Sequence, residues 1–507
     1  MIRFIFLYFL LFFISSPGVT QKVDVSYSIP KPEKLSKTCE DGFVGKLNGE
    51  YLMMMTGSSY YFEKIDNNLS SKGSLPIKFI DGKGPDTHTS PIIFNDKLIQ
   101  LGAKQEKKSI KYSIFFAQVK NSYNELSWTK FYDLEVTELD RVYYTLSPGR
   151  NFLLVTVVSK NKTESPSKVS YFIFDRDFKL HTKLNLNDKV DIEGHPFYVE
   201  QLDDTGKLFV FITVEEKDYW SLTNFKYKII SWDGNRLQIY QLPLESTFIS
   251  SFKCKIMNGQ FIGAGNFCYQ KPFNQEIGIY FFRLDIANEN LFFDLAKFPE
   301  KILLNYISQS KIDKGFGVNG FRPEFIALTE DNSLFFVYEF QAPKVAYDNP
   351  GYTYYWEYDD ILVTRISPDN KIEWINLIPK TQYSSKSAST ALYSCEKYQH
   401  YAHFGISCMV KGNSLHIVYN EDPENLSPNR AYKDWKKLGK NEKCVQVVTS
   451  VNSDGSHTTQ VLDLKNFKPG EIALRPQNHF WDNDDGSLIL LYEKGNSYGF
   501  MKVSIND

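Results

Sequence analysis

One phrase recurs along this chain of 507 residues, and the recurrence limits the possible folds more than any other feature of the sequence. "NSLFFVYEF" begins at Asn332, "NSLHIVYNE" begins at Asn413, and "GSLILLYEK" begins at Gly486. Each copy is a polar turn followed by a short apolar run. Units that recur at intervals of several tens of residues are typical of repeat architectures.

Aligning the chain on the first apolar residue after the turn extends the three copies to eight. The eight anchors are Leu52, Leu98, Phe152, Leu208, Phe261, Leu334, Leu415 and Leu488. A short run of strand-forming residues precedes most anchors, and a second hairpin with its own polar turn follows, as in "YKIISWDGNRLQIYQL" from Tyr227. Each unit therefore predicts four antiparallel strands, a to d, with tight turns at a–b and c–d.

Four-stranded sheets of this kind bury their faces by stacking on one another, and radial stacking produces a β-propeller. We therefore expect an all-β fold with eight four-stranded blades; seven blades and an atypical unit is the alternative. The last unit is one strand short, whereas "KVDVSYSI" (22–29) alternates as a strand near the start of the chain. We expect this N-terminal strand to complete the last blade, which removes two open sheet edges.

The first residues, "MIRFIFLYFLLFFISSPGVTQ", have the pattern of a secretory signal peptide, with Arg3 before an apolar run that ends at Ile14. The run is too short to span a bilayer as a helix. We expect residues 1–20 to be a signal peptide and residues 21–507 to form one propeller domain. The mature chain would then be exported to the periplasm, the cell surface or the extracellular space, with no membrane span.

Charge and cysteine content narrow the possible functions. A formal net charge of -2 gives no support for nucleic-acid binding, which usually shows a basic excess. Six cysteines permit disulfides in an exported chain, but they allow fifteen connectivities, so no pairing is predicted. No C-x-x-C pair favours zinc, and no C-x-x-C-H attachment site favours a haem-based redox role. Three N-x-S/T triplets predict surface loops, and would accept glycans only in a eukaryotic secretory pathway; they begin at Asn68, Asn161 and Asn425.

The c–d turns resemble those of known propellers. "SPDNKIEW" (367–374) is similar to the Asp-box turn of sialidase-type propellers, although Lys371 and Glu373 stand where that pattern has Gly and Thr. The same turns resemble the blades of quinone-dehydrogenase-like propellers. Over nearly its whole mature length the chain resembles secreted propeller-like proteins of Bacteroidetes that have no assigned function. The resemblance implies the fold and no particular chemistry, because such turns lie away from the active sites of those families.

The long connections should gather on one face of the ring. In a propeller the b–c loops and the d–a connections emerge together, and the tight turns lie on the opposite face. The long insertions of this chain are all of the first kind, and they span residues 263–276, 296–322, 341–360, 381–404 and 420–443. Loops on a rigid scaffold commonly carry function, so we expect a ligand on this face.

Two of these insertions have the composition of a recognition surface. "YDNPGYTYYWEYDD" (347–360) holds Tyr355 and Trp356 among acidic residues, and "SPNRAYKDWKKLG" (427–439) holds Trp435 in an expected short helix ending at Gly439. Aromatic faces beside carboxylates suit a sugar or a peptide. The alternative is that these aromatic residues seal the loops against the ring.

Cations also recur at the start of innermost strands. Arg322 and Arg475 each precede a proline there, and His195 does the same in the fourth unit. Converging cations could hold a carboxylate or a sulfate. Isolated histidines are far more often structural than metal ligands, so no metal site is predicted. No cofactor is indicated, and no catalytic residue is assigned.

These features predict a non-enzymatic binding or scaffold propeller that recognises a glycan, a peptide or a protein partner through its loop-rich face. The alternative is a carbohydrate-active enzyme, either a glycoside hydrolase or a sialidase-like protein, with its site on the same face. Glycoside hydrolysis needs two carboxylates about 5–10 Å apart. The insertions and adjoining strands offer several acids, namely Glu324, Glu339, Asp359, Asp360 and Glu396. Acids converging in a deep polar pocket would favour the enzyme, and a flat aromatic surface would favour binding.

Overall fold

The computed structural model describes most of the chain. The described residues are 22–31, 42–56, 60–76, 91–106, 109–120, 125–135, 139–159, 168–188, 198–217, 223–244, 247–269, 275–348, 351–388, 403–427, 435–439, 443–482 and 485–506. The expected signal peptide, residues 1–20, lies outside them. No helix within these ranges is long and apolar enough to cross a membrane.

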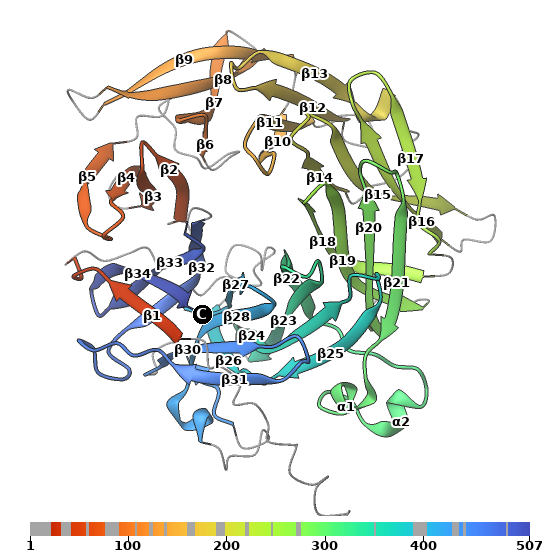
Figure 1. The fold of residues 1–507 in the computed structure, drawn as a ribbon, viewed down its shortest axis with the longest axis vertical. Coiled ribbons are helices and arrows are strands. Elements are labelled where there is room, and N and C mark those ends of the chain that lie inside the picture. Colours follow the sequence, from red (N-terminus) through yellow and green to blue (C-terminus); the bar gives the residue numbers. More distant parts are fainter. Residues whose placement is uncertain are drawn as a thin grey trace, which may run out of the picture.

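Eight antiparallel sheets stand around a common axis, so the predicted eight-bladed β-propeller is confirmed (Figure 1). Each blade has four strands, and the first strand of each lies nearest the axis. The strands of blades 1 to 4 are β2 (Gly42–Leu47), β3 (Glu50–Thr56), β4 (Tyr60–Ile65) and β5 (Ser71–Pro76); β6 (Ile92–Phe94), β7 (Lys97–Glu106), β8 (Ser109–Lys120) and β9 (Glu125–Leu134); β10 (Leu139–Leu146), β11 (Phe152–Ser159), β12 (Lys168–Asp175) and β13 (Leu180–Asn185); and β14 (Tyr198–Leu202), β15 (Leu208–Lys217), β16 (Thr223–Trp232) and β17 (Leu237–Gln241).

Blades 5 to 8 follow the same plan, with additions in blade 6. Their strands are β18 (Thr247–Met257), β19 (Gln260–Tyr269), β20 (Gly278–Asp285) and β21 (Leu291–Lys297); β22 (Phe321–Leu328), β23 (Leu334–Asp348), β24 (Gly351–Ile366) and β25 (Ile372–Ile378), with β26 (Gln382–Ala388) and β29 (Leu438–Gly439) added; β27 (Ser407–Lys411), β28 (Ser414–Glu421), β30 (Val445–Val451) and β31 (His457–Val461); and β32 (Ala473–Asp482), β33 (Ser487–Lys494), β34 (Ser497–Asn506) and β1 (Lys22–Tyr27). The helices are η1 (Leu186–Asp188), α1 (Glu300–Leu303), α2 (Gln309–Ile312) and η3 (Pro423–Leu426).

The N-terminal strand β1 closes the ring as expected. It pairs antiparallel with β34 in a register that runs from Lys22 opposite Asn506 to Tyr27 opposite Met501. The Tyr492 hydroxyl donates a hydrogen bond to the carbonyl of Ser28 at 2.7 Å, just beyond the strand. Segments from the two ends of the chain thus share one sheet, in which β1 covers the edge of β34 and becomes the outermost strand of blade 8.

The repeat that predicted the blades is a repeat of core positions. All eight anchors lie in the second strand of a blade, and apart from Phe152, which is partly buried, each is at most 1 % exposed. Their neighbours on the strand interleave with those of the next blade; Phe211 of blade 4 stacks on Phe282 of blade 5 with ring centroids 5.6 Å apart. Adjacent blades therefore share their apolar cores, which is how sheets that are marginal alone become stable together.

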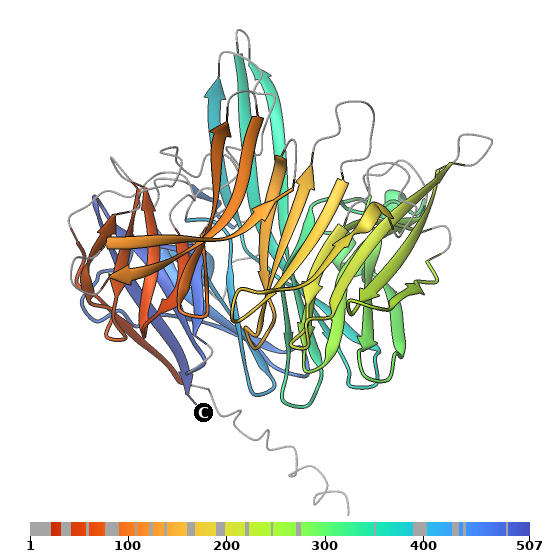
Figure 2. The ribbon, with the colours of Figure 1, turned by 90° about the horizontal axis from the view of Figure 1, so that it is seen from above.

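Tight turns and long connections lie on opposite faces (Figure 2). The a–b turns use residues that accept positive φ, such as Asn48 and Gly49 (52° and 79°) and Asn258 and Gly259 (46° and 70°). Two consecutive positive φ values match the twist of a two-residue hairpin, and Asn-Gly is the usual sequence for it. We call this side the tight-turn face and the other the loop-rich face.

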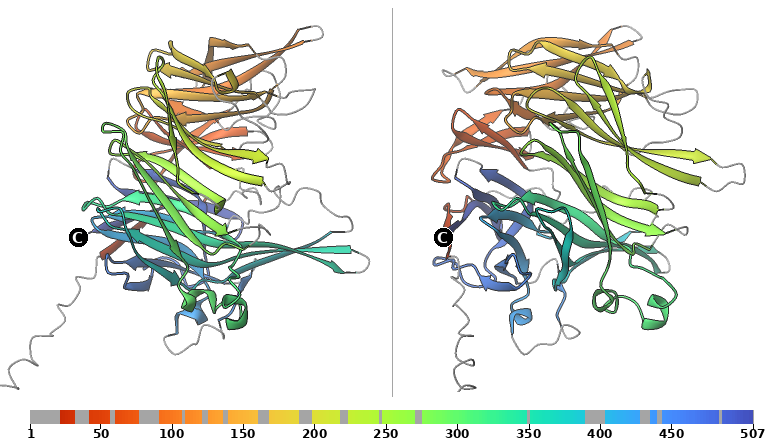
Figure 3. Two further views of the ribbon diagram at one scale, coloured as in Figure 1. Left: turned by 90° about the vertical axis from the view of Figure 1, so that its right-hand side faces the viewer. Right: turned by 45° about the vertical axis from the view of Figure 1, so that its right-hand side comes forward.

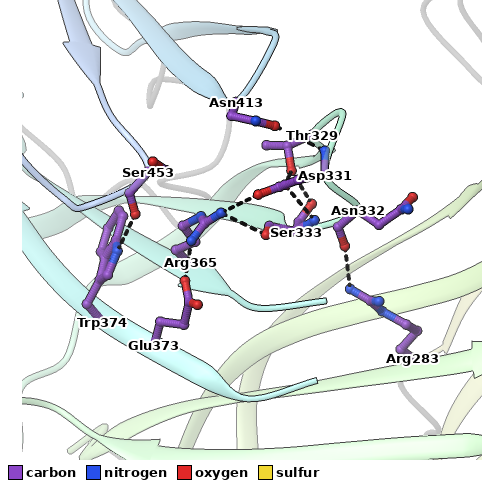
Figure 4. Close-up of polar contacts among 10 residues, drawn as sticks. All are labelled: Arg283, Thr329, Asp331, Asn332, Ser333, Arg365, Glu373, Trp374, Asn413 and Ser453. Carbon is purple, nitrogen blue, oxygen red and sulfur yellow. Dashed lines mark hydrogen bonds and ion pairs between the residues drawn. The ribbon is translucent and has the colours of Figure 1, made fainter. Parts of the chain in front are cut away.

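Polar contacts on the tight-turn face lie both within blade 6 and between blade 6 and its neighbours (Figure 4). Arg365 of β24 pairs with Asp331 at 2.7 Å, pairs also with Glu373, and donates to the Ser333 hydroxyl at 2.8 Å. The indole N–H of Trp374 donates to the carbonyl of Ser453 in blade 7 at 3.0 Å. The "SPDNKIEW" stretch thus forms a c–d turn that ties two blades together.

Several of the expected loops contain regular structure. The 341–360 stretch is not a loop, because β23 and β24 continue through it and project as a long hairpin (Figure 3, left). Likewise β19 extends to Tyr269, α1 and α2 lie between β21 and β22, and β26 pairs with β24. The prediction of a short helix ending at Gly439 is wrong for its last residues. Leu438 and Gly439 form the strand β29, which pairs in parallel with Gln382 and Tyr383 of β26.

The structure also tests the predicted surface loops at the N-x-S/T triplets, and it shows the state of four of the six cysteines. Asn425 is not in a surface loop: it is 3 % exposed, and its side-chain amide donates to Glu421 and to the carbonyl of Lys436. Asn68 is exposed, and Asn161 lies outside the described residues. Four cysteines are buried free thiols, namely Cys254, Cys268, Cys408 and Cys444; Cys39 and Cys395 are not among the described residues.

Candidate functional site

A pocket of about 590 Å³ opens on the loop-rich face beside blade 6. Most of its lining comes from the connection that holds α1 and α2, the extended β23–β24 hairpin, and the b–c connection of blade 7. Gln275 reaches it from the b–c connection of blade 5, and Thr381 from between β25 and β26. The lining residues are Gln275, Asn305, Tyr306, Ile307, Gly317, Val318, Asn319, Phe340, Glu357, Asp359, Thr381, Trp435 and Lys437. Aromatic rings, side-chain amides and charges therefore meet in one concavity.

The aromatic part of the pocket is held in place by the core beneath it. The short helix α1 buries Ile302 and Leu303, which anchors the connection and brings Tyr306 over blade 6. The ring of Tyr306 stacks on that of Phe340 with centroids 5.1 Å apart and an interplanar angle of 23°. The Tyr306 hydroxyl donates to the buried carboxylate of Asp360. Both rings are thus fixed before any ligand arrives.

Two carboxylates reach the pocket from a single strand. Glu357 and Asp359 are alternate residues of β24, so they lie on the same side of it. Tyr358 between them turns to the other side, where it is 3 % exposed and packs against Phe404. The extension of β24 beyond the blade therefore determines which carboxylates face the pocket.

The two carboxylates have different partners. The Lys437 ammonium lies 2.9 Å from Oε1 of Glu357. Asp359 instead accepts a hydrogen bond on Oδ1 from the backbone N–H of Gln382 at 3.1 Å. Burial raises the pKa of Asp359 to about 6, against the opposing pull of Lys437 and Lys380. Asp359 therefore changes charge in the mildly acidic range.

A buried polar layer lies behind the pocket. Lys380 is 0 % exposed, and its ammonium contacts Oε1 of Glu339 at 2.8 Å and the carbonyl of Tyr358 at 2.6 Å. Its backbone N–H donates to Asp360 at 3.3 Å. Lys380 thus contacts the acids of this layer, and its side chain is not among those that line the pocket.

Two further carboxyl groups near this layer, those of Glu324 and Glu421, have raised pKa values. Burial, together with the charge of Glu339, raises the pKa of Glu324 to about 7. Burial also raises the pKa of Glu421 to about 7, although Asn425 and the backbone N–H of Asp422 both donate to it. The loop-rich side of blades 6 and 7 therefore concentrates carboxyl groups that are costly to ionise.

Of the aromatic residues singled out in the sequence, Trp435 lines the pocket. Trp356 lies on β24 but is 4 % exposed and is not among the lining residues. Tyr355 belongs to β24, and its side chain lies outside the described part of the structure. The alternative that these aromatic residues seal the ring therefore fits Trp356, and ligand contact fits Trp435.

The two expected cations that the structure describes lie near the starts of the innermost strands of their blades, in agreement with their sequence positions. Arg322 is half-buried on β22 of blade 6, and Arg475 is on β32 of blade 8, with blade 7 between them. Arg475 is 2 % exposed, and both its Nε and its Nη2 bond to Glu493. The charge of Arg475 is therefore paired with an acid of the same protein. His195 lies outside the described residues.

The sequence patterns do not single out Tyr306, Phe340, Glu357 or Lys437 as site residues. Glu357 carried a usable signal, because the alternation in "YWEYDD" places Glu357 and Asp359 on one side of a strand. Tyr306 and Phe340 carried none, because only the fold brings their segments together. Within the described ranges, no group of three or more His, Cys, Asp or Glu residues could hold a metal ion.

No protein-family model matches the sequence, and no curated protein sequence matches it. Among solved structures, the chain is similar to the WD40 domain of SCAP from fission yeast, with 10 % identity, a TM-score of 0.39, and coverage of 96 % of this chain and 98 % of that one. It is also similar to polysaccharide lyase Uly1, with 10 % identity, a TM-score of 0.39, and coverage of 93 % and 100 %. These likenesses are too distant to bear on any residue or activity, and the architecture rests on the strand pairing itself.

Proposed function

We propose that this chain is an exported, non-enzymatic binding protein that recognises a glycan through the pocket on its loop-rich face. The observation that supports this most is the lining: a pocket of about 590 Å³ in which aromatic rings, amides and carboxylates converge. Ligand sites commonly have volumes of roughly 300–1,000 Å³ and combine apolar walls with a few placed polar groups. Export is supported by the signal-peptide pattern of residues 1–20.

The lining suits a sugar for a physical reason. A pyranose ring has apolar C–H faces and a rim of hydroxyl groups. The rings of Tyr306 and Trp435 offer surfaces for those faces. The side-chain amides of Asn305 and Asn319 and the carboxylate of Asp359 offer acceptors and donors for the hydroxyls. A peptide is the other small-ligand class that such a lining could take.

The test is calorimetric titration of the mature protein with a panel of oligosaccharides and short peptides. Changing Trp435→Ala should weaken binding of the recognised sugar by roughly fivefold or more, since truncating an aromatic anchor of a binding site commonly costs more than about 1 kcal/mol. The control is Phe292→Ala, an exposed aromatic residue on the outer strand β21, which should bind as the parent does. Sugar binding that survives Trp435→Ala unchanged would exclude this pocket, and peptide binding alone would exclude a glycan.

A second candidate function is glycoside hydrolysis, and one observation favours it. Alternate residues of a strand lie roughly 7 Å apart, so Glu357 and Asp359 fall within the spacing of the acid and base of inverting glycosidases. Asp359, with its raised pKa, would be the acid, and Glu357 the base. Release of reducing sugar that Asp359→Asn abolishes would establish the enzyme. Sugar that binds and is recovered intact after long incubation would establish the binding protein.

A further inference from the structure

The pocket lining has a negative charge that the protein leaves uncompensated. Its ionisable groups are Glu357, Asp359 and Lys437, and Lys437 pairs with Glu357 at 2.9 Å. Within the described part of the chain, Asp359 has no ion-pair partner, and its one hydrogen bond comes from the backbone N–H of Gln382. An ionised Asp359 therefore gives the lining a net charge of -1.

The groups packed behind Asp359 do not supply the missing cation. Lys380 is engaged with Glu339, and Asp360 receives the Tyr306 hydroxyl. On the blade 7 side, Lys436 pairs with Asp422 at 3.3 Å. The titratable groups that act on Asp359 are thus two acids, Glu357 and Asp360, and two lysines that already serve other acids. A cation that enters the pocket would be the first to meet Asp359 directly.

The walls also suit a cation. Tyr306, Phe340 and Trp435 line the same space, and the faces of such rings attract an ammonium group, more strongly when the cation is desolvated. A carboxylate in a partly enclosed site adds a charge-assisted hydrogen bond, which is about twice as strong as a neutral one. Both effects favour the same chemical group at the same place.

We infer that the pocket selects a ligand that presents a protonated amine to Asp359; within the proposed glycan class, this means an amino sugar with a free amino group. The inference rests on the proposed function for the sugar, and on the pocket alone for the amine. Its pH dependence follows from Asp359, because protonation of that carboxyl removes the charge that attracts the amine. With a pKa of about 6, the preference should be present at pH 7 and lost at pH 5.

The experiment is calorimetric titration of the mature protein with a glucosamine oligosaccharide and with its N-acetylated counterpart, at pH 7 and pH 5. We expect the free amine to bind at least tenfold more tightly at pH 7, and the two sugars to bind alike at pH 5. Asp359→Asn should remove the preference at both pH values. The control, Asp177→Asn, changes an exposed acid in the c–d turn of blade 3 and should keep the preference.

A second variant gives a gain instead of a loss. Lys437→Gln releases Glu357 from its internal ion pair, so the lining charge falls from -1 to -2 and the preference for the free amine should increase. Equal binding of both sugars by the parent at pH 7 would overturn the inference and leave the glycan function standing. Binding of a lysine-containing peptide but of no sugar, abolished by Asp359→Asn, would keep the amine requirement and overturn the glycan function.

Discussion

The tight-turn face and the loop-rich face both bury charged side chains, but they pair them differently. On the tight-turn face, Arg365 pairs with Asp331 and Glu373 of its own blade, and the backbone N–H of Asp331 donates to Asn413 of blade 7. On the loop-rich face, Asp359 lines a pocket with a backbone N–H as its partner, and Glu421 and Glu324 have raised pKa values. The loop-rich face also holds internally paired charges, such as Lys380 with Glu339, but Asp359, which lines the pocket, has no ion-pair partner among the described residues.

The comparison separates structural polar groups of the propeller from candidate functional ones. A buried charge that is paired with acids of the scaffold, as Arg365 is, contributes to the geometry of the blades. A buried acid with a raised pKa lowers stability at neutral pH, because its ionised form is poorly solvated. A cost of that kind is common at functional sites, and it lies here on the face with the pocket.

The largest effect should come from opening the ring that carries both faces. Deleting Lys22–Tyr27 removes the β1–β34 ladder and the half-buried contacts of Val23, Val25 and Tyr27. The free energy of unfolding should fall by on the order of 5 kcal/mol, which thermal denaturation of the mature protein would detect. Changing Lys22 and Ser26, both exposed, to alanine keeps the strand and should leave the melting temperature nearly unchanged. A melting curve unaffected by the deletion would refute a stabilising role for the closure.

A smaller effect should follow from unpairing the tight-turn face. Arg365→Met keeps the aliphatic stem and leaves Asp331 and Glu373 without their shared cation. We expect a loss of about 3 kcal/mol, the lower end for breaking a buried pair, because both acids are about one-third exposed. Lys437→Ala breaks a half-exposed pair on the other face and should cost under about 1 kcal/mol. Equal losses in the two variants would erase the contrast between the faces.

The smallest effect concerns pH and the acids of the loop-rich face. Folding raises the pKa of Glu421 from 4.5 to about 7, so the folded state binds this proton more tightly and stability falls as pH rises through that range. Glu421→Gln cannot ionise. It should match the parent at pH 4 and exceed it by about 2 kcal/mol at pH 6, as measured by denaturant titration at both pH values. A variant less stable than the parent at pH 6 would show that the ionised carboxylate is stabilised by its surroundings.

The fold was predictable because its information is local and repeated. Anchors such as Leu208 and Leu415 follow Gly or Asn turns in every unit, and the 22–29 strand alternates visibly, so blade number and closure could both be derived. The 341–360 stretch was misjudged because Asn349 and Pro350 indicate a turn and the surrounding tyrosines suggested a loop surface. Tyrosine is also a strong strand former, and here the flanks of the turn extend two strands beyond the blade.

The site was less predictable because it depends on contacts between units. The sequence indicates that Asp359 is an acid on the loop-rich face. It does not indicate that Asp359 shares a pocket with Lys437 and Tyr306, because separate connections of the ring bring these residues together. Arg475 is a second example. Its position beside a proline suggests an anion site, and the structure adds a partner that the sequence does not indicate, because Arg475 bonds to Glu493, which lies opposite Ala473 on the next strand. Sequence spacing does not reveal such cross-strand partners.

The pairing of β1 with β34 also imposes an order in time. During synthesis, Lys22–Tyr27 is made long before Ser497–Asn506, so the earliest strand must wait, without its partner, until the latest one is available. As long as β1 and β34 of one chain have not paired, the edge of β34 is open. The β1 strand of another copy fits that edge equally well, because the register is identical. At high concentration, refolding of this chain should therefore compete with strand exchange between copies, and slow dilution should favour the single closed ring.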